Sequence, residues 1–506
     1  MNKTRVLLLY SSEVQSSVVA GYLRVAPIGL FFINSYLKKQ GYETKIVHLD
    51  INQFNTSMPF AKYYKMGLRQ EIKQFDPHYI GYSFRNLFHW GSMPKNWRKL
   101  INHLSISLEK HTINFLRRST RAPIIGGGPA FMLAPKLYMD YLGLDYGIIG
   151  EGELAFEKLL THLRAGGKIE KLPGLVYRKN DVILSNPHQH IKDLTAMPIM
   201  NVSDIEGYRE LYYDNGGYGS IQTKRGCGFR CIYCHYPYLE GNKYRLRDPA
   251  TVVEEIIDIK EKYDINHFFF VDSVFSTPSS HSQKICEELI SRGADIKWAA
   301  HTNPRGITRK LLEIYRESGC HNVIFTPDTL SEKTLKSYQK DFSVDEVKKA
   351  VLLLKKVGIP FEVSLILGGP GEDEETVNET VAFCDEYLQE IPILFFSGMW
   401  LHSSAPAMQT AISEGIFPDR ESMEFDKIVL ANDFEANRKL NYFFPHVKKR
   451  RGAFLNRIYK KIRKYKRVII EKDIVVDWTT GTVKHAPELN VIENQRPWHN
   501  GMKGRI

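Results

Sequence analysis

The chain has 506 residues, of which 43% are hydrophobic and 12% aromatic. This size favours two or three domains, and the apolar content argues against wholesale disorder. The net charge of +12 suits anionic partners such as phosphates, nucleic acid or a membrane surface, although a basic solvated surface is the plainer explanation. No run of about 18 or more uninterrupted apolar residues occurs, which argues against a membrane span.

Residues 1 to about 165 alternate apolar runs with helical patterns. A helix is predicted to open at Pro27 and Gly29. Five short runs predict buried strands: 6–10, 44–49, 79–83, 122–125 and 146–149. Strands that alternate with helices imply right-handed crossovers. We therefore expect residues 1–165 to form a doubly wound parallel sheet of the flavodoxin or Rossmann type, whose ligands bind at the carboxyl ends of the strands.

Polar residues and glycines follow three of these predicted strands. Bare glycine backbone lets a large ligand approach closely, although a glycine run suits a plain tight turn equally well. Because strand ends of a parallel sheet meet at one edge, we expect these residues to line a common site. The candidates are Ser83, Arg85, Gly126, Gly127, Gly128, Gly150 and Glu151.

The rest of the chain divides into three predicted parts. Residues 166–215 form a connector with a hairpin at 172–177 and 182–184. In residues 216–400, strands at 221–224, 267–272, 298–302, 323–326, 363–367 and 393–396 alternate with helices such as 248–262 and 344–357. This pattern predicts a partial (β/α)6 barrel resembling a TIM barrel, open at one end to cofactors and substrate. Residues 401–506 form an extension that we expect to be mainly helical.

A basic run at 448–467 dominates this extension. Its apolar residues fall on one helical stripe, which predicts a helix packed on the barrel with a charged outer face. Alternatively, the helix meets an anionic substrate, a carrier or a membrane surface. No motif for binding RNA or DNA is present, so nucleic acid is not expected as a partner.

A loop near the middle of the chain carries Cys227, Cys231 and Cys234 at CxxxCxxC spacing. Gly226 and Gly228 give the backbone the freedom to turn the three thiolates toward one small object. Four thiolates would close an iron–sulfur cluster, whereas three leave one iron open. Zinc usually requires a fourth close ligand and a second paired motif, and no second CxxC lies nearby. The spacing therefore favours an iron–sulfur cluster over zinc or a disulfide.

The other three cysteines are Cys286, Cys320 and Cys384, and their contexts are typical of buried small residues. The first residues predict a β-strand and not a signal peptide, since no small-residue cleavage site follows. A reducing cytoplasm suits this cysteine usage and an exposed cluster better than a disulfide framework does.

The CxxxCxxC loop, with Tyr233 just before its third cysteine, resembles the signature of the radical-SAM superfamily. Together with the upstream set of Pro27-x-Gly29, Ser83, Gly126 to Gly128 and Gly150 to Glu153, it resembles the cobalamin-dependent radical-SAM enzymes over roughly residues 1 to 400. The resemblance implies a 4Fe–4S cluster whose open iron binds S-adenosylmethionine. It also implies cobalamin in the N-terminal domain and an external one-electron donor such as flavodoxin or ferredoxin.

The resemblance also implies roles for residues around S-adenosylmethionine. Tyr233 would lie against the adenine, and Asp272 would face the amino group, although Asp272 suits a helix N-cap equally. Gly368 and Gly369 would line the adenosine, although they also suit a glycine turn. Arg305 would bind the methionine carboxylate or a substrate anion.

Residues 76–81 spell DxHxxG, the motif by which other cobalamin proteins give a histidine to cobalt. Here the motif enters the third predicted strand, so His78 should lie at the amino end of the sheet, away from the ligand edge. We therefore expect no cobalt bond from His78. Arg85, a permanent cation, cannot ligate a metal and would instead disfavour an axial ligand.

The function implied by this resemblance is methyl transfer from methylcobalamin to an unactivated carbon of a small molecule or natural product, after hydrogen abstraction by a 5′-deoxyadenosyl radical. The first alternative keeps both domains but carries out rearrangement, ring contraction or dehydration. The second is a non-catalytic iron–sulfur electron-transfer protein, which the three-ligand count disfavours. The sequence identifies neither the substrate nor a catalytic residue. The excess of positive charge is compatible with an anionic substrate.

Overall fold

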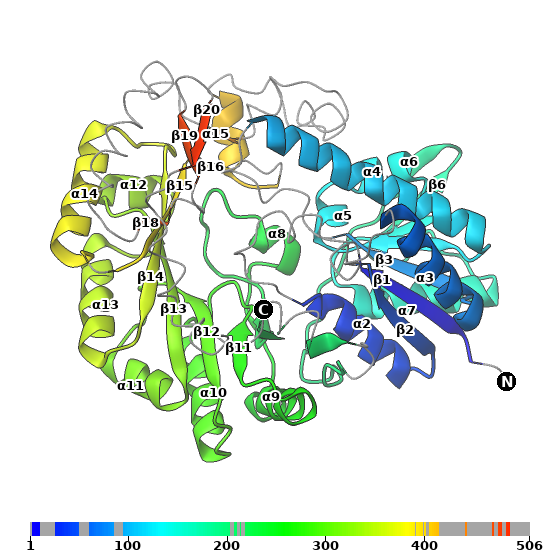
Figure 1. The fold of residues 1–506 in the computed structure, drawn as a ribbon, viewed down its shortest axis with the longest axis horizontal. Coiled ribbons are helices and arrows are strands. Elements are labelled where there is room, and N and C mark those ends of the chain that lie inside the picture. Colours follow the sequence, from blue (N-terminus) through cyan, green and yellow to red (C-terminus); the bar gives the residue numbers. More distant parts are fainter. Residues whose placement is uncertain are drawn as a thin grey trace.

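The fold is described from a computed structural model over residues 3–10, 26–49, 60–84, 95–202, 207–209, 213, 218–389, 391–397, 399–400 and 404–413 and over four short strands further on. Two sheets, each flanked by helices, lie side by side, and α8 (Tyr236–Glu240) lies between them (Figure 1).

The N-terminal sheet has seven strands in the order β2-β1-β3-β4-β5-β6-β7. The first five in sequence are parallel and follow the 2-1-3-4-5 order of flavodoxin-like folds, as predicted. Their bounds are β1 (Arg5–Tyr10), β2 (Glu43–His48), β3 (Tyr79–Ser83), β4 (Ile124–Gly127) and β5 (Tyr146–Ile148). The helices are α2 (Ile28–Lys39), α3 (Phe60–Phe75), α4 (Lys95–Ser119), α5 (Pro129–Leu133), α6 (Pro135–Leu142) and α7 (Gly152–Ala165).

Alternation along β1 explains why both faces of this sheet are covered. Val6 and Leu8 join the hydrophobic cluster of α2 and α7, whereas Leu7 and Leu9 join the cluster of α3 and α4. Side chains of successive strand residues point to opposite faces, so a strand that is apolar throughout must be buried on both sides.

The hairpin that we assigned to a connector is formed by β6 (Leu175–Lys179) and β7 (Val182–Ser185). It does not stand apart from the N-terminal sheet but pairs antiparallel with β5 and extends that sheet. The reason is that β5 would otherwise be an edge strand with unpaired backbone groups.

The second sheet is entirely parallel, in the order β18-β15-β14-β13-β12-β11-β8. Its strands are β8 (Gly219–Ile221), β11 (His267–Phe270), β12 (Lys297–Thr302), β13 (Cys320–Asp328), β14 (Phe361–Leu367), β15 (Ile393–Ser397) and β18 (Val468–Ile469). Helices α9 (Pro249–Tyr263), α10 (Ser279–Ser291), α11 (Arg309–Glu317), α13 (Val344–Val357) and α14 (Glu374–Tyr387) arc around its outer face (Figure 1). Five of the six predicted strands are present, whereas the strand predicted at 221–224 is divided between the end of β8 and the short strand β9 (Lys224–Arg225) of a separate pair. Because β8 and β18 end the strand order unpaired with each other, the barrel is partial, as expected.

Short elements complete the fold. The strands β9 (Lys224–Arg225) and β10 (Arg245–Leu246) form an antiparallel pair beside β8, and α12 (Glu332–Ser337) precedes α13. Beyond residue 400 the described residues form helix α15 (Ala407–Ser413) and the strands β17 (Asn441–Tyr442), β18, β19 (Ile474–Asp477) and β20 (Thr482–His485). Strand β17 pairs with β16 (Met399–Trp400). Most of the extension, including the basic run at 448–467, lies outside the described residues.

One hydrophobic cluster continues from the first sheet into the second. It includes Phe31 and Phe32 of α2, Met200 and Val202 of the segment between β7 and β8, and Trp298 of β12. The apolar faces of the two halves are therefore buried against common neighbours, which favours a fixed arrangement of the halves over free domain motion.

Candidate functional site

The cysteine loop leaves β9 through a turn that only glycine can make. Gly226 has φ +88°, and a Cβ at this residue would lie 2.1 Å from the carbonyl oxygen of Lys243. The Cys227 amide donates to the oxygen of Gly241 at 3.0 Å, and the Ile232 amide donates to the oxygen of Tyr338 at 3.1 Å. The loop is thus tied to the segment after α8 on one side and to the end of α12 on the other.

All three loop cysteines are free thiols. Burial raises the pKa of Cys231, and it raises the pKa of Cys234 to about 12; the charges of neighbouring cysteines add to both shifts. Within the described ranges no three His, Cys, Asp or Glu side chains are grouped closely enough to hold a metal ion. The three thiols are neighbours on one loop and are near enough for the charge of one to affect the pKa of the next.

The chemistry of this donor set fits an iron–sulfur cluster. Thiolates are the usual ligands of such clusters, and Cys227, Cys231 and Cys234 supply three on one short loop. Because buried neutral thiols must lose their protons to become ligands, metal binding here would release protons and would draw the loop together.

Asp272, which we expected near the amino group of S-adenosylmethionine, binds the protein instead. Its carboxylate accepts hydrogen bonds from the Thr223 amide at 2.8 Å and hydroxyl at 2.6 Å, and from the Lys224 ammonium at 2.9 Å. The Lys224 and Asp272 side chains are 1% and 0% exposed. Asp272 is therefore neither a helix cap nor free toward a ligand: it anchors β9, the strand that carries the cysteine loop.

Tyr233, which lies on the loop between Cys231 and Cys234, contacts a buried ion pair of Lys340 and Asp328. Its hydroxyl donates to the carboxylate of Asp328, and that carboxylate is also ion-paired with the Lys340 ammonium. The ammonium lies 5.4 Å from the centre of the Tyr233 ring, close enough for a cation–π contact. The Asp328 side chain thus fixes the tyrosine that is expected to lie against adenine.

The remaining residues expected around S-adenosylmethionine lie at carboxyl ends of barrel strands. Arg305 follows β12 and is 49% exposed, ion-paired with the more exposed Asp341. The amide of Gly368, after β14, donates to the Glu372 carboxylate, and the Gly369 amide donates to the Tyr338 hydroxyl at 3.2 Å. A Cβ on Gly369 would lie 2.2 Å from that hydroxyl, so packing against Tyr338 already explains this glycine.

The glycines at the end of β4 also have neighbours within their own domain. A Cβ on Gly126 would lie 2.6 Å from Leu144 Cδ1. At Gly128, where φ is +92°, a Cβ would lie 2.6 Å from the oxygen of Phe84 and 2.9 Å from the Ser83 hydroxyl. Gly127 has the most room, with its nearest atom at 3.6 Å. Ser83 pairs with Gly127, so these residues do meet at one edge of the sheet.

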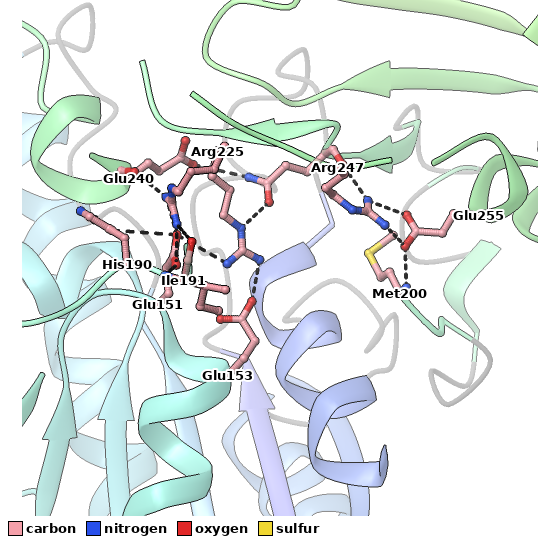
Figure 2. A network of polar contacts seen from close by, with 11 residues as sticks. Glu151, Glu153, His190, Ile191, Met200, Arg225, Glu240, Arg247 and Glu255 are labelled. Carbon is pink, nitrogen blue, oxygen red and sulfur yellow. Dashed lines mark hydrogen bonds and ion pairs between the residues drawn. The ribbon is translucent and has the colours of Figure 1, made fainter. Parts of the chain in front are cut away.

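Gly150 and Glu151 lie at the same edge, where β5 gives way to α7. Gly150 has φ +82° and approaches His188. The Glu151 carboxylate does not point to a free edge of the sheet: it accepts from the Ile191 amide at 2.6 Å and from Arg245 at 2.8 Å, and Arg225 lies 3.6 Å away. Figure 2 shows that Glu151 belongs to a network of charged residues that includes Arg225 of β9 and Glu240 of α8.

Two further expectations concern cobalt. His78 lies at the amino end of β3, where its Nδ1 accepts a hydrogen bond from the Arg5 amide at 3.0 Å. This position is at the opposite end of β3 from Ser83, as predicted. Arg85 lies outside the described residues.

Sequence reasoning missed the charged residues that hold the cysteine loop, Arg225, Glu240, Arg245 and Lys340, and a neighbouring buried pair, Arg247 and Glu255; it gave Glu153 only within the set Gly150 to Glu153. The available signal was the pair Lys224-Arg225, two adjacent cations in a short strand directly before the cysteine loop. Cations in a buried strand require buried anions, but the sequence does not say which anions these are. None of the described helices is both long and apolar enough to cross a membrane.

We predict that Gly226→Ala prevents cluster loading. The alanine methyl group would collide with the Lys243 carbonyl, and its φ would be strained. Gly358→Ala is the matched control, because Gly358 has φ +79° but no atom within 4 Å of a Cβ, so strain alone should cost about 1–3 kcal/mol. Iron and sulfide content after anaerobic reconstitution measures the difference. Equal loading of the two variants would contradict the steric role of Gly226.

Asp272→Asn should destabilise the protein by about 3–5 kcal/mol, because it leaves the Lys224 ammonium buried without its counter-charge. The control is Asp264→Asn at an ion pair with Arg209, where the aspartate side chain is 92% exposed and the expected cost is about 0–1 kcal/mol. Chemical denaturation measures both, and similar losses would show that the Lys224–Asp272 pair is not the anchor described above.

Burial raises the pKa of Glu240 to about 7, well above the usual value for a glutamate. Between the unfolded and folded pKa values the unfolded state loses this proton first, so stability should fall as pH rises from about 5 to about 7. In Glu240→Gln this contribution to the fall should disappear, whereas the exposed Glu313→Gln should behave as wild type. Urea midpoints across this pH range provide the measurement, and an unchanged slope in Glu240→Gln would refute the prediction.

Two family models match the chain, the B12 binding domain over residues 18–160 and the Radical SAM superfamily over residues 221–384. Among curated proteins, the "Uncharacterized methyltransferase PH0819" of Pyrococcus horikoshii is 25% identical over 361 residues, 71% of this chain and 72% of that protein. An anaerobic magnesium-protoporphyrin IX monomethyl ester cyclase of Rubrivivax gelatinosus is 29% identical over 269 residues, 51% of this chain and 47% of that protein.

The fold is shared with a solved structure of the radical S-adenosylmethionine methyltransferase TsrM from Kitasatospora setae, which has cobalamin and a [4Fe-4S] cluster bound. The TM-score is 0.74 at 20% identity, covering 93% of this chain and 91% of that one. The B12 binding domain falls on the first sheet and the radical-SAM domain on the second, with the cysteine loop at its start. The chain belongs to the cobalamin-dependent radical-SAM enzymes.

Proposed function

We propose that this enzyme transfers a methyl group from cobalamin to a carbon atom of a small organic substrate. The observation that carries this proposal is the combination of both domains in a chain that aligns over 71% of its length with a methyltransferase and over 93% with the TsrM structure. A radical-SAM domain alone would leave the methyl carrier unexplained.

We assign cobalamin to residues 1–165 and the cluster with S-adenosylmethionine to residues 216–400. Residues 166–215, whose hairpin extends the first sheet, connect these two parts. When bound, the cluster and S-adenosylmethionine supply a 5′-deoxyadenosyl radical, and cobalamin supplies the methyl group. Cys227, Cys231 and Cys234 would hold the cluster. Ser83 and the glycines 126–128 border the edge of the first sheet where a corrin would lie.

The residues around the barrel opening have distinct tasks in this proposal. Tyr233, held by Asp328, would present its ring to the adenine. Arg305 is half exposed and meets only the exposed Asp341 among the ion pairs described, so it is available to a carboxylate of S-adenosylmethionine or of the substrate. The task of the protein is to orient these groups and to exclude water around them.

Three further properties belong to this proposal. TsrM is also known with tryptophan and a SAM analogue bound, which supports a small-molecule substrate here, and Arg305 would suit an anionic one. An external one-electron donor such as flavodoxin or ferredoxin would reduce the cluster. We place the enzyme in the cytoplasm, because its six cysteines are free thiols, three of them on the cluster loop.

The similarity to the magnesium-protoporphyrin cyclase supports a second candidate. It has the higher identity of the two curated relatives, 29% against 25%, but covers half of this chain. In that case the same two domains would form a ring in the substrate, without methyl transfer.

Methyl-labelled S-adenosylmethionine separates the two candidates. The reconstituted enzyme, with cobalamin and a reductant, is incubated with a pool of candidate substrates. We expect labelled product together with deoxyadenosine. Deoxyadenosine without labelled product would instead identify the second candidate, and the absence of both would overturn the assignment of radical chemistry.

Cys234→Ala should abolish both products, because the loop then offers only two thiolates to the cluster. The matched control is Cys286→Ala in α10, a buried thiol whose pKa is raised by burial to about 12 and which lies away from the loop in sequence. Iron content of the two variants is measured first. A Cys234→Ala protein that still loads a cluster and cleaves S-adenosylmethionine would contradict the ligand assignment.

A further inference from the structure

The geometry points to Glu153 and Arg225 as a positioning pair that fixes the cluster loop relative to the cobalamin domain, and so sets the distance between the two cofactors. This inference rests on the proposed function only in requiring that both cofactors bind to this chain. The sequence analysis named Glu153 only within the set Gly150 to Glu153 and gave Arg225 no role.

The first argument is the place of the two residues in the chain. Arg225 is the last residue of β9 and lies two positions before Cys227. Glu153 lies in the first turn of α7, three residues after Gly150 at the carboxyl edge of the first sheet. The pair therefore joins the entry of the cluster loop to the edge that would carry cobalamin.

The second argument is that β9 is held from two directions. Lys224 is paired with Asp272, which follows β11 of the barrel. The neighbouring Arg225 donates to Glu153 at 2.5 Å, as Figure 2 shows. Successive residues of a strand point to opposite sides, so one cation fastens β9 to the barrel and the next fastens it to the cobalamin domain.

The third argument is the geometry of the Arg225 side chain, which is 8% exposed. Its Nε donates to Gln222 at 2.9 Å, and Glu151 lies 3.6 Å from its other terminal nitrogen. The guanidinium also lies 5.2 Å from the centre of the Phe32 ring in α2. Contacts in several directions hold the planar guanidinium in one orientation, which a lysine could not reproduce.

A second arm of the network supports the same placement. Arg245 pairs with Arg225 across β9 and β10. Its guanidinium donates to the Glu151 carboxylate at 2.8 Å and to the backbone carbonyl oxygen of Glu240 at 2.6 Å. The Glu240 carboxylate accepts from the Gly226 amide at 3.1 Å. Gly226, the residue before the first cluster cysteine, is thus linked through Glu240 and Arg245 to Glu151 at the start of α7.

These ion pairs orient the cysteine loop more than they stabilise the fold. A buried ion pair adds little net stability compared with well-packed apolar residues, and the continuous hydrophobic cluster already joins the two halves. What apolar packing does not fix is the orientation of the loop. Errors of about 1 Å in the placement of reacting groups can reduce rates on the order of 100-fold.

The test compares Glu153→Gln with Glu255→Gln. Glu255 is a matched control because it is also a buried partner of an arginine, accepting from Arg247 at 2.9 Å and from the Met200 amide at 2.6 Å. The Arg247–Glu255–Met200 contacts do not involve α7 (Figure 2). Both substitutions remove one buried negative charge and keep the shape of the side chain.

The main readout is the electron-spin interaction between cob(II)alamin and the reduced cluster, which depends on their distance and needs no substrate. We expect one narrow distance distribution in the wild type and in Glu255→Gln, and a broadened or shifted distribution in Glu153→Gln. Arg225→Lys should broaden it too, and this variant covers the case in which Glu153→Gln fails to fold. Iron and cobalt contents are measured in each sample.

A second readout is the ratio of methylated product to deoxyadenosine. It should fall about tenfold or more in Glu153→Gln while deoxyadenosine continues to form, because radical formation needs only the barrel and methyl transfer needs both sites. Wild-type distances in both Glu153→Gln and Arg225→Lys would overturn the positioning role. A wild-type protein that binds no cobalamin would overturn the proposed function, and the inference with it.

Discussion

The arrangement of this enzyme depends on one short strand whose two cations are both buried. A buried charge without a partner is strongly destabilising, so β9 can occupy its position only where anions meet it on both sides. Asp272 of the barrel meets Lys224, and Glu153 of the first domain meets Arg225. The cysteine loop begins at the next residue. The place of the cluster is thus defined by electrostatics before any cofactor contact is considered.

The two sheets then place the cofactor sites next to each other. In parallel sheets the carboxyl edge receives ligands. Here α7, which begins at that edge of the first sheet, contacts the entry of the cysteine loop through Glu153 and Arg225. Helix α8 lies between the halves (Figure 1). A shared hydrophobic cluster joins the halves, and the Arg225–Glu153 ion pair connects the entry of the cysteine loop to α7.

Two residues expected to touch cofactors are scaffold residues. Asp272 and Glu151 both follow strands at ligand-binding edges, and both use their carboxylates to bind cations or amides of this chain. An acidic residue at a strand end can face either a ligand or a neighbouring segment. The choice depends on which cations approach from elsewhere in the fold: Arg245 of the second domain for Glu151, and Lys224 of the same domain for Asp272. Tyr233 is a different case, since its hydroxyl binds Asp328 while the residue is only partly buried.

The amino-acid sequence by itself determined the local features: the two series of alternating strands and helices, the three-thiol loop, and the position of His78 at the wrong end of its strand for a cobalt ligand. These follow from periodicity and spacing, which act over a few residues. Only the tertiary structure decided that the hairpin at 175–185 extends the first sheet, and that Glu151, Glu153 and Asp272 bind Arg245, Arg225 and Lys224. The partners of a buried charge lie up to 94 residues away in the chain, and no local pattern identifies which carboxylate will reach which cation.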